Sequence, residues 1–160
     1  MTFERDGKVL RGEGTITFGV LDAFERALSA LPGDIEPGKL ELVLHSPGGV
    51  VPEAVALARR IRAAGLTTRV DADGYCASSC PILFAAGVKR IASKDAWIGV
   101  HRVYVDSGIF GSIDDGIGEA QRVAAEVQDL LDGFGVDPLV WTHAMRTPKQ
   151  SLYFFTPAEL

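Results

Sequence analysis

Short apolar runs alternate with segments of helical periodicity along most of the chain. Residues 40–45 and 66–71 are short runs rich in apolar or β-branched residues and bounded by turn-forming residues, which predicts buried strands. Apolar side chains recur at helical spacing at 21–31 and 51–65, which predicts a helix before each of these strands. Such alternation implies βαβ crossovers, so we predict an α/β fold with a largely parallel sheet.

The other segments extend this pattern. Strands are expected at 8–12, 90–93 and 96–102, and residues 74–87 are expected to form a turn that runs into an apolar, buried helix. A glycine-rich loop at 108–118 and a long amphipathic helix at 117–134 follow. Another helix begins at Asp137-Pro138, and Thr156-Pro157 resembles a helix start. With 160 residues, we expect one domain over 1–160.

Composition excludes several classes of function. Hydrophobic residues make up 47% of the chain and charged residues 23%, as in an ordinary globular protein. The net charge of -5 gives no basic footprint for nucleic acid, and no apolar run approaches the roughly 20 residues that span a bilayer. The first residues do not resemble a signal peptide. We therefore expect a periplasmic protein if a signal peptide has been removed, and a cytoplasmic one otherwise.

Two turns, each after a strand and before a helix, carry the candidate chemistry. In parallel sheets, sites lie beyond the carboxyl ends of the strands, which places Ser46-Pro47-Gly48-Gly49 and the segment 73–78 on one rim. Gly48 and Gly49 can expose backbone N–H groups near a helix start, as an oxyanion hole requires. A plain strand-to-helix turn explains the same glycines.

Ser78 is the candidate nucleophile, and the N–H of Ser79 can point the same way. The competing interpretation makes Ser78 a helix N-cap. His101, at the end of the strand 96–102, is the candidate general base. His45 and His143 are its competitors.

Cys76 and Cys80 lie four residues apart and have three interpretations. They are two small buried hydrophobic residues, or a local disulfide in an oxidising compartment, or, least favoured, nucleophiles. The pair lacks enough partners for a structural zinc site, and we expect neither a metal nor a cofactor.

The ordered set of these segments resembles the proteolytic subunit of Clp-type proteases. The segments are Ser46-Pro47-Gly48-Gly49, then 74–79, then 86–91, and then Ile98-Gly99-Val100-His101. The cysteines on either side of the serine resemble a bacterial, periplasmic-type branch of Clp-protease-like proteins.

This resemblance implies a crotonase/ClpP-like spiral of ββα units with a C-terminal helical handle at 117–134. The handle would pack subunits into homo-oligomeric rings. The implied activity is that of a serine peptidase, which hydrolyses peptides or unfolded protein through an acyl-enzyme. Ser78 matches the nucleophile, His101 the base, and the N–H groups of Gly49 and Ser79 the oxyanion donors.

The chain departs from the Clp pattern at the third member of the triad. The position of the family's aspartate falls near Ser151, and no acid is there. Either the site is a Ser-His dyad, or Ser151 or a backbone carbonyl orients His101, or an acid comes from elsewhere. The acids considered for that role are Asp106, Asp114, Asp115 and Asp137.

Two other functions compete with a peptidase. The missing aspartate is consistent with a non-catalytic assembly or binding module that retains the fold. A crotonase-like acyl-thioester enzyme is less favoured, because the chain has no basic cluster for the nucleotide phosphates of coenzyme A. Clp rings work with an ATPase, but no feature of this sequence supports such a partner.

Overall fold

The computed structural model describes residues 1–30, 37–104 and 113–160. In chain order its elements are β1 (Thr2–Asp6), β2 (Val9–Glu13), α1 (Val20–Ser29), the 3-10 turn η1 (Pro37–Lys39), β3 (Glu41–His45), α2 (Val51–Ala63), β4 (Thr67–Val70), β5 (Tyr75–Ala77), α3 (Cys80–Ala85), β6 (Lys89–Ala92), β7 (Trp97–Val100), α4 (Ile113–Gly133), α5 (Pro138–Arg146) and β8 (Tyr153–Phe154). The predicted strand at 8–12 is β2, and those at 40–45, 66–71, 90–93 and 96–102 correspond to β3, β4, β6 and β7.

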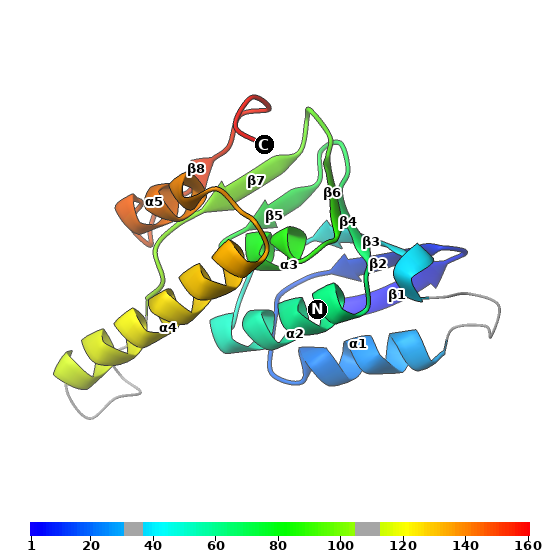
Figure 1. Cartoon of the computed structure of the whole chain (residues 1–160), viewed down its shortest axis with the longest axis horizontal. Coiled ribbons are helices and arrows are strands. Elements are labelled where there is room, and N and C mark those ends of the chain that lie inside the picture. The colour runs from blue at the N-terminus through cyan, green and yellow to red at the C-terminus, as the bar shows by residue number, and fades with distance from the viewer. Residues whose placement is uncertain (31–36, 105–112) are drawn as a thin grey trace.

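The larger sheet has the order β1-β2-β3-β4-β6, and all its pairs except β1–β2 are parallel. The prediction of a mixed α/β fold with a largely parallel sheet is therefore confirmed. Helices α1 and α2 lie side by side below this sheet (Figure 1). Val20, Phe24 and Leu28 recur every four residues along α1, so that one stripe of the helix is buried.

A second sheet carries the candidate site. It has the order β5-β7-β8, with β5 and β7 parallel and β8 antiparallel to β7. An isolated bridge between Ser46 and Cys76 joins it to the end of β3. Gly99 lets β7 approach β8, since a Cβ there would lie 2.8 Å from the ring of Phe154. Because β5 pairs with β7 and is bridged to the end of β3, the segments that follow these three strands lie close together.

Four local features of the structure differ from the predictions made from the sequence. The N-terminal residues form β1, an edge strand paired with β2 through a two-residue turn in which Gly7 has a φ of 57°. Residues 74–87 contain the strand β5 as well as the helix α3, and the short strand β8 was not predicted. Strands of two or three residues show no periodicity, because alternation needs at least four residues to be recognised. Thr156 begins a turn rather than a helix.

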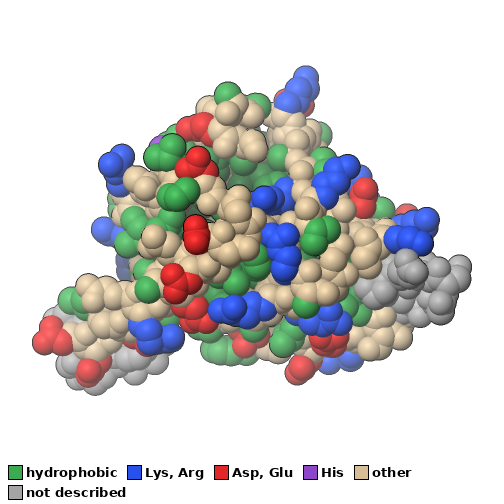
Figure 2. All heavy atoms as spheres, in the orientation of Figure 1, with side chains coloured by type: hydrophobic (Ala, Val, Ile, Leu, Met, Phe, Trp, Pro, Cys, Tyr) green, Lys and Arg blue, Asp and Glu red, His purple; other side chains and the backbone are tan. Residues whose placement is uncertain are grey.

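Helix α4 begins at Ile113, so part of the expected glycine-rich loop is helical, and residues 105–112 lie outside the described residues. The buried side chains of α4 are Val123, Val127, Leu130 and Leu131, all in its second half. Its first half projects beyond the body (Figure 1), and acidic side chains follow its exposed surface (Figure 2). In the part of the chain that the structure describes, no helix is long and apolar enough to cross a membrane.

Candidate active site

Ser78 occupies a sharp turn between β5 and α3. Its φ is 62°, in the left-handed region that residues other than glycine rarely adopt. Its backbone N–H donates to the carbonyl of Gly99 at 3.0 Å, and the N–H of Ala77 donates to the carbonyl of Ser46 at 3.0 Å. Flanking strands thus hold the turn in place. Strained strand-to-helix turns of this kind present the nucleophile of α/β-hydrolases.

The interpretation of Ser78 as a helix N-cap is wrong. Ser79 is the residue that caps α3, and its side chain makes no capping hydrogen bond. The hydroxyl of Ser79 donates instead to the carbonyl of Gly49 at 3.2 Å. The Ser78 side chain, half-buried, is therefore not used to start the helix.

A disulfide joins Cys76 in β5 to Cys80 in the first turn of α3. The two Cα atoms are 5.1 Å apart, and both residues are fully buried. The cross-link therefore connects the strand before Ser78 to the helix after it. With both sulfur atoms in this bond, neither cysteine is a thiolate nucleophile.

The glycine turn lies directly against Ser78. Gly48 has a φ of 90°, and a Cβ there would lie 2.6 Å from the Cβ of Ser78 and from the carbonyl oxygen of Ala77. At Gly49, with a φ of 148°, a Cβ would lie 2.0 Å from the carbonyl oxygen of Ile16. Both positions need glycine because backbone or Ser78 atoms occupy the space of a side chain.

The two glycines differ in the direction of their N–H groups. The Gly48 N–H donates to the hydroxyl of Ser46 at 3.1 Å, so it is already engaged, and the expectation that Gly48 supplies an oxyanion donor is not supported. The carbonyl of Gly48 and the N–H of Val50 both bond to Ile16 on the far side of the turn. In an extended chain, the backbone polar groups of successive residues point to opposite sides. Gly49 lies between Gly48 and Val50, so its N–H points away from Ile16 and toward Ser79.

Two backbone donors are therefore left near Ser78. Among the described residues, no acceptor takes the N–H of Gly49 or that of Ser79. Both residues line the same cleft as Ser78.

His101 follows β7, and its ring is oriented by the backbone. The ring atom Nδ1 lies 2.9 Å from the carbonyl oxygen of Arg102. A carbonyl only accepts hydrogen bonds, so Nδ1 carries a proton in this contact, and in the neutral imidazole Nε2 is then the atom with the free lone pair. This is the tautomer that a general base needs. The sequence allowed Ser151, a backbone carbonyl or a distant acid to orient His101, and the group found beside its ring is a backbone carbonyl.

Ser78 and His101 leave neighbouring strands at the same end. Ala77 pairs with Gly99 in the parallel β5–β7 ladder, so Ser78 and His101 lie one and two residues beyond that pair. Both line one cleft with Gly49 and Ser79. All four residues that the resemblance implied therefore line one cleft, and among the described residues no hydrogen bond joins the hydroxyl of Ser78 to His101.

The competing histidines lie elsewhere. Nδ1 of His45 accepts the backbone N–H of Tyr75 at 3.3 Å. The ring of His143 stacks on Tyr153, with the ring centroids 4.0 Å apart. Neither lines the cleft.

No acid in the described ranges contacts the ring of His101. Asp137 lines the cleft, but its Oδ1 accepts the N–H of Leu139 at 2.8 Å and caps α5. Asp114 and Asp115 lie in the first turn of α4 and do not line the cleft, and Asp106 is outside the described residues. Ser151 lines the cleft without a hydrogen bond from its hydroxyl to His101.

The cleft around these residues is large. It encloses about 1760 Å³, more than the roughly 300–1,000 Å³ of a typical small-molecule pocket. Its walls include apolar side chains such as Ile82, Val100, Val140 and Phe155. It has room for an extended chain of several residues.

Comparison with known proteins supports the fold but does not identify a reaction. No protein-family model matches the chain. No curated protein matches it either. Among solved structures it is similar to a ClpP1 mutant from Listeria monocytogenes, with a TM-score of 0.71 and 16% sequence identity, over 95% of this chain and 84% of that one. The expectation of a ClpP-like α/β fold is confirmed by this likeness.

Proposed function

We propose that the chain is a ClpP-like serine peptidase that uses Ser78 as nucleophile and His101 as general base. The observation that carries the proposal is the strained, left-handed turn at Ser78 in one cleft with His101, whose Nδ1 contacts the carbonyl of Arg102. Ser78 lies against a turn that only glycine can form.

In this mechanism the Oγ of Ser78 attacks the carbonyl carbon of the peptide bond while Nε2 of His101 takes the hydroxyl proton. The N–H groups of Gly49 and Ser79 stabilise the negative charge that develops on the carbonyl oxygen. His101 then returns its proton to the leaving amine. Water, deprotonated by His101, hydrolyses the acyl-enzyme and frees Ser78.

The carbonyl of Arg102 takes the orienting role of the missing acid. It holds the required tautomer, but a neutral carbonyl stabilises the imidazolium less than a carboxylate does. Replacing the triad aspartate lowers kcat by up to about 10⁴-fold in a serine protease. We therefore propose slow turnover through a Ser-His dyad, with no role for the hydroxyl of Ser151.

The cleft does not favour acyl-thioester chemistry with a carboxylate as acid or base. Its described acids are Glu119, Asp137 and Glu159, and each accepts hydrogen bonds from within the protein.

Self-association through α4 as a handle, and an oxidising compartment consistent with the disulfide, also belong to this proposal.

Labelling with a fluorophosphonate tests the proposal directly. We expect one adduct by intact mass on the wild-type protein, none on Ser78→Ala, and at least 100-fold slower labelling of His101→Ala. Matched controls are His45→Ala and Ser151→Ala, which should label at nearly the wild-type rate. Equal labelling of wild type and Ser78→Ala, or no adduct on the wild type, would refute it and favour a non-catalytic module.

A further inference from the structure

The cleft is lined by basic side chains that no acid among the described residues neutralises. Lys94, Arg102 and Lys149 line it, and none forms an ion pair with an acid in the described ranges. The fourth basic residue of the lining, Arg90, donates to the carbonyl of Phe134.

The acids of the same cleft are all engaged. The carboxylate of Glu119 binds Arg122 at 2.7 Å, and Asp137 caps α5. Glu159 accepts from the hydroxyl and the N–H of Thr156, as well as from Tyr153. Only Glu119 is paired with a cation, so Asp137 and Glu159 keep their negative charges. Four basic residues of the lining stand against these two acids, so the described part of the cleft carries an excess of positive charge, although the chain has a net charge of -5.

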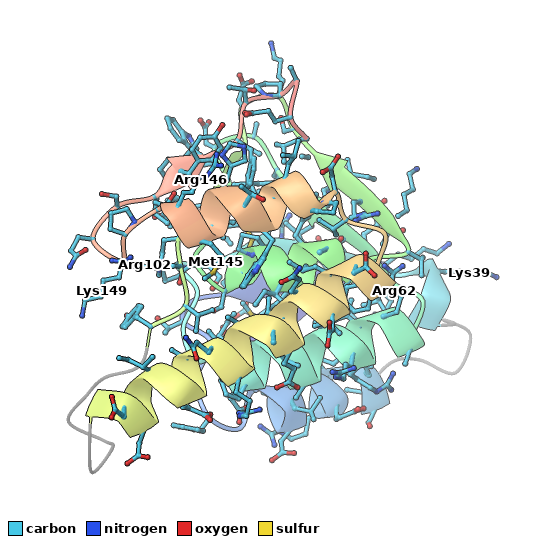
Figure 3. All side chains as sticks on the ribbon, turned by 60° about the vertical axis from the view of Figure 1, so that its left-hand side comes forward. Lys39, Arg62, Arg102, Met145, Arg146 and Lys149 are labelled. Carbon is cyan, nitrogen blue, oxygen red and sulfur yellow. A yellow bond between two sulfur atoms is a disulfide. The ribbon has the colours of Figure 1, made fainter. Side chains whose placement is uncertain are left out.

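Two of these cations lie on the side of His101. Arg102 follows it directly, and the ammonium of Lys149 lies 5.1 Å from the ring centroid of Tyr104, which in turn lies 5.8 Å from the ring of His101. In Figure 3, Arg102, Arg146 and Lys149 gather at one end of the molecule, while Arg62 and Lys39 lie at the other. The group comes from the segment after β7, the end of α5 and the loop that follows it.

The position of His101 also indicates which part of a peptide substrate would reach Arg102 and Lys149. The base returns its proton to the leaving amine, so the leaving fragment lies on its side of Ser78. An extended peptide advances about 3.3 Å per residue, so the distances from His101 to Tyr104 and from Tyr104 to Lys149 together span at most about three residues.

We infer, on the basis of the proposed peptidase function, that the cleft takes peptides with acidic side chains within about three residues after the bond that is cut, and that Lys149 recognises them. The ammonium lies against the face of Tyr104, which holds it in place, and no described residue accepts a hydrogen bond from it, so it can donate to a carboxylate. Lys149 is thus a specificity residue and not part of the catalytic group.

Binding to a variant that cannot turn over separates this inference from the proposed chemistry. Fluorescein-labelled peptides with several glutamates, and matched peptides with glutamine in their place, are titrated into Ser78→Ala at 50 and 300 mM NaCl. We expect the glutamate peptide to bind about two- to five-fold more tightly at low salt and to lose that advantage at high salt. Equal affinity for the two peptides at low salt overturns the inference.

The same measurement on further variants assigns the residue. Adding Lys149→Gln should abolish the preference, Lys149→Arg should retain it, and the exposed Lys8→Gln, outside the cleft, should leave it unchanged. A preference that survives in Lys149→Gln refutes the role of Lys149. If the acidic peptide binds preferentially while the wild type neither cleaves it nor takes a fluorophosphonate, the peptidase proposal fails and the recognition of acidic peptides stands. If the wild type cleaves, mass spectrometry should find acidic residues among the first three positions of the leaving fragments.

Discussion

Replacing Gly48 by alanine tests whether the glycine turn supports Ser78 by close contact. A left-handed φ costs an alanine about 1–2 kcal/mol wherever it occurs. At Gly48 the added Cβ would also meet the Cβ of Ser78 and the carbonyl oxygen of Ala77 at 2.6 Å, which is too close for a methyl carbon. Overpacking of this kind typically costs about 1–3 kcal/mol more. We therefore expect Gly48→Ala to lower the free energy of unfolding by about 2–5 kcal/mol.

Gly14 offers a matched control. It has the same φ of 90°, but a Cβ there would meet nothing within 4 Å. Gly14→Ala should therefore show only the backbone cost, about 1–2 kcal/mol. The difference between the two variants isolates the contact with the Ser78 turn.

Urea unfolding, followed by the fluorescence of Trp97 and Trp141, measures the free energies. Fluorophosphonate labelling of Ser78, under conditions where each variant is folded, measures the site. We expect Gly14→Ala to label at the wild-type rate and Gly48→Ala to label at least ten-fold more slowly, since the clash is relieved only by moving Ser78 or the glycine turn. Equal stability and equal labelling of the two variants would show that the turn does not position Ser78.

Three further predictions concern the rest of the molecule. Reduction of the Cys76–Cys80 bond, or its replacement by Cys76→Ala with Cys80→Ala, should lower the free energy of unfolding by about 2 kcal/mol for so short a loop; urea curves of oxidised and reduced protein that superimpose would contradict it. The hydroxyl of Tyr153 and then the backbone and hydroxyl of Thr156 lower the pKa of Glu159 to about 2, so their stabilisation of the C-terminal turn is complete above the ordinary pKa of 4.5 and is lost as the pH falls through about 2. An NMR titration should show this midpoint and its rise in Tyr153→Phe; an unchanged midpoint in that variant argues against the contact. Leu83→Ala, at a fully buried position of α3, should cost about 2–5 kcal/mol in urea unfolding, whereas Leu139→Ala, 62% exposed, should change stability by less than about 0.5 kcal/mol; similar losses in both would contradict the burial of α3.

Much of the fold could be predicted from local pattern. The helices α1 and α2 have long apolar stripes, and β3 is a run of apolar residues between turn signals. Segments of two or three residues, β5 and β8, escaped prediction because their strand conformation comes from pairing with β7, not from their own composition.

The candidate site divides in the same way. The order of Gly49, Ser78 and His101 was recognisable in the sequence because the segments that contain them resemble those of Clp-type proteases. The sequence also indicated two cysteines close enough to pair, but only the tertiary structure joined them across the Ser78 turn.

The sequence by itself indicated candidates for catalysis: Ser78 in a turn between a strand and a helix, His101 at a strand end, and a pair of glycines in a neighbouring turn. Tertiary structure decided how they are used. It engaged the N–H of Gly48 with Ser46, left that of Gly49 available, and set the carbonyl of Arg102 against His101 in place of an acid. The physical reason is that these contacts join near neighbours in the chain, but the backbone conformation that directs them depends on pairing between distant segments, such as that of Ser46 with Cys76.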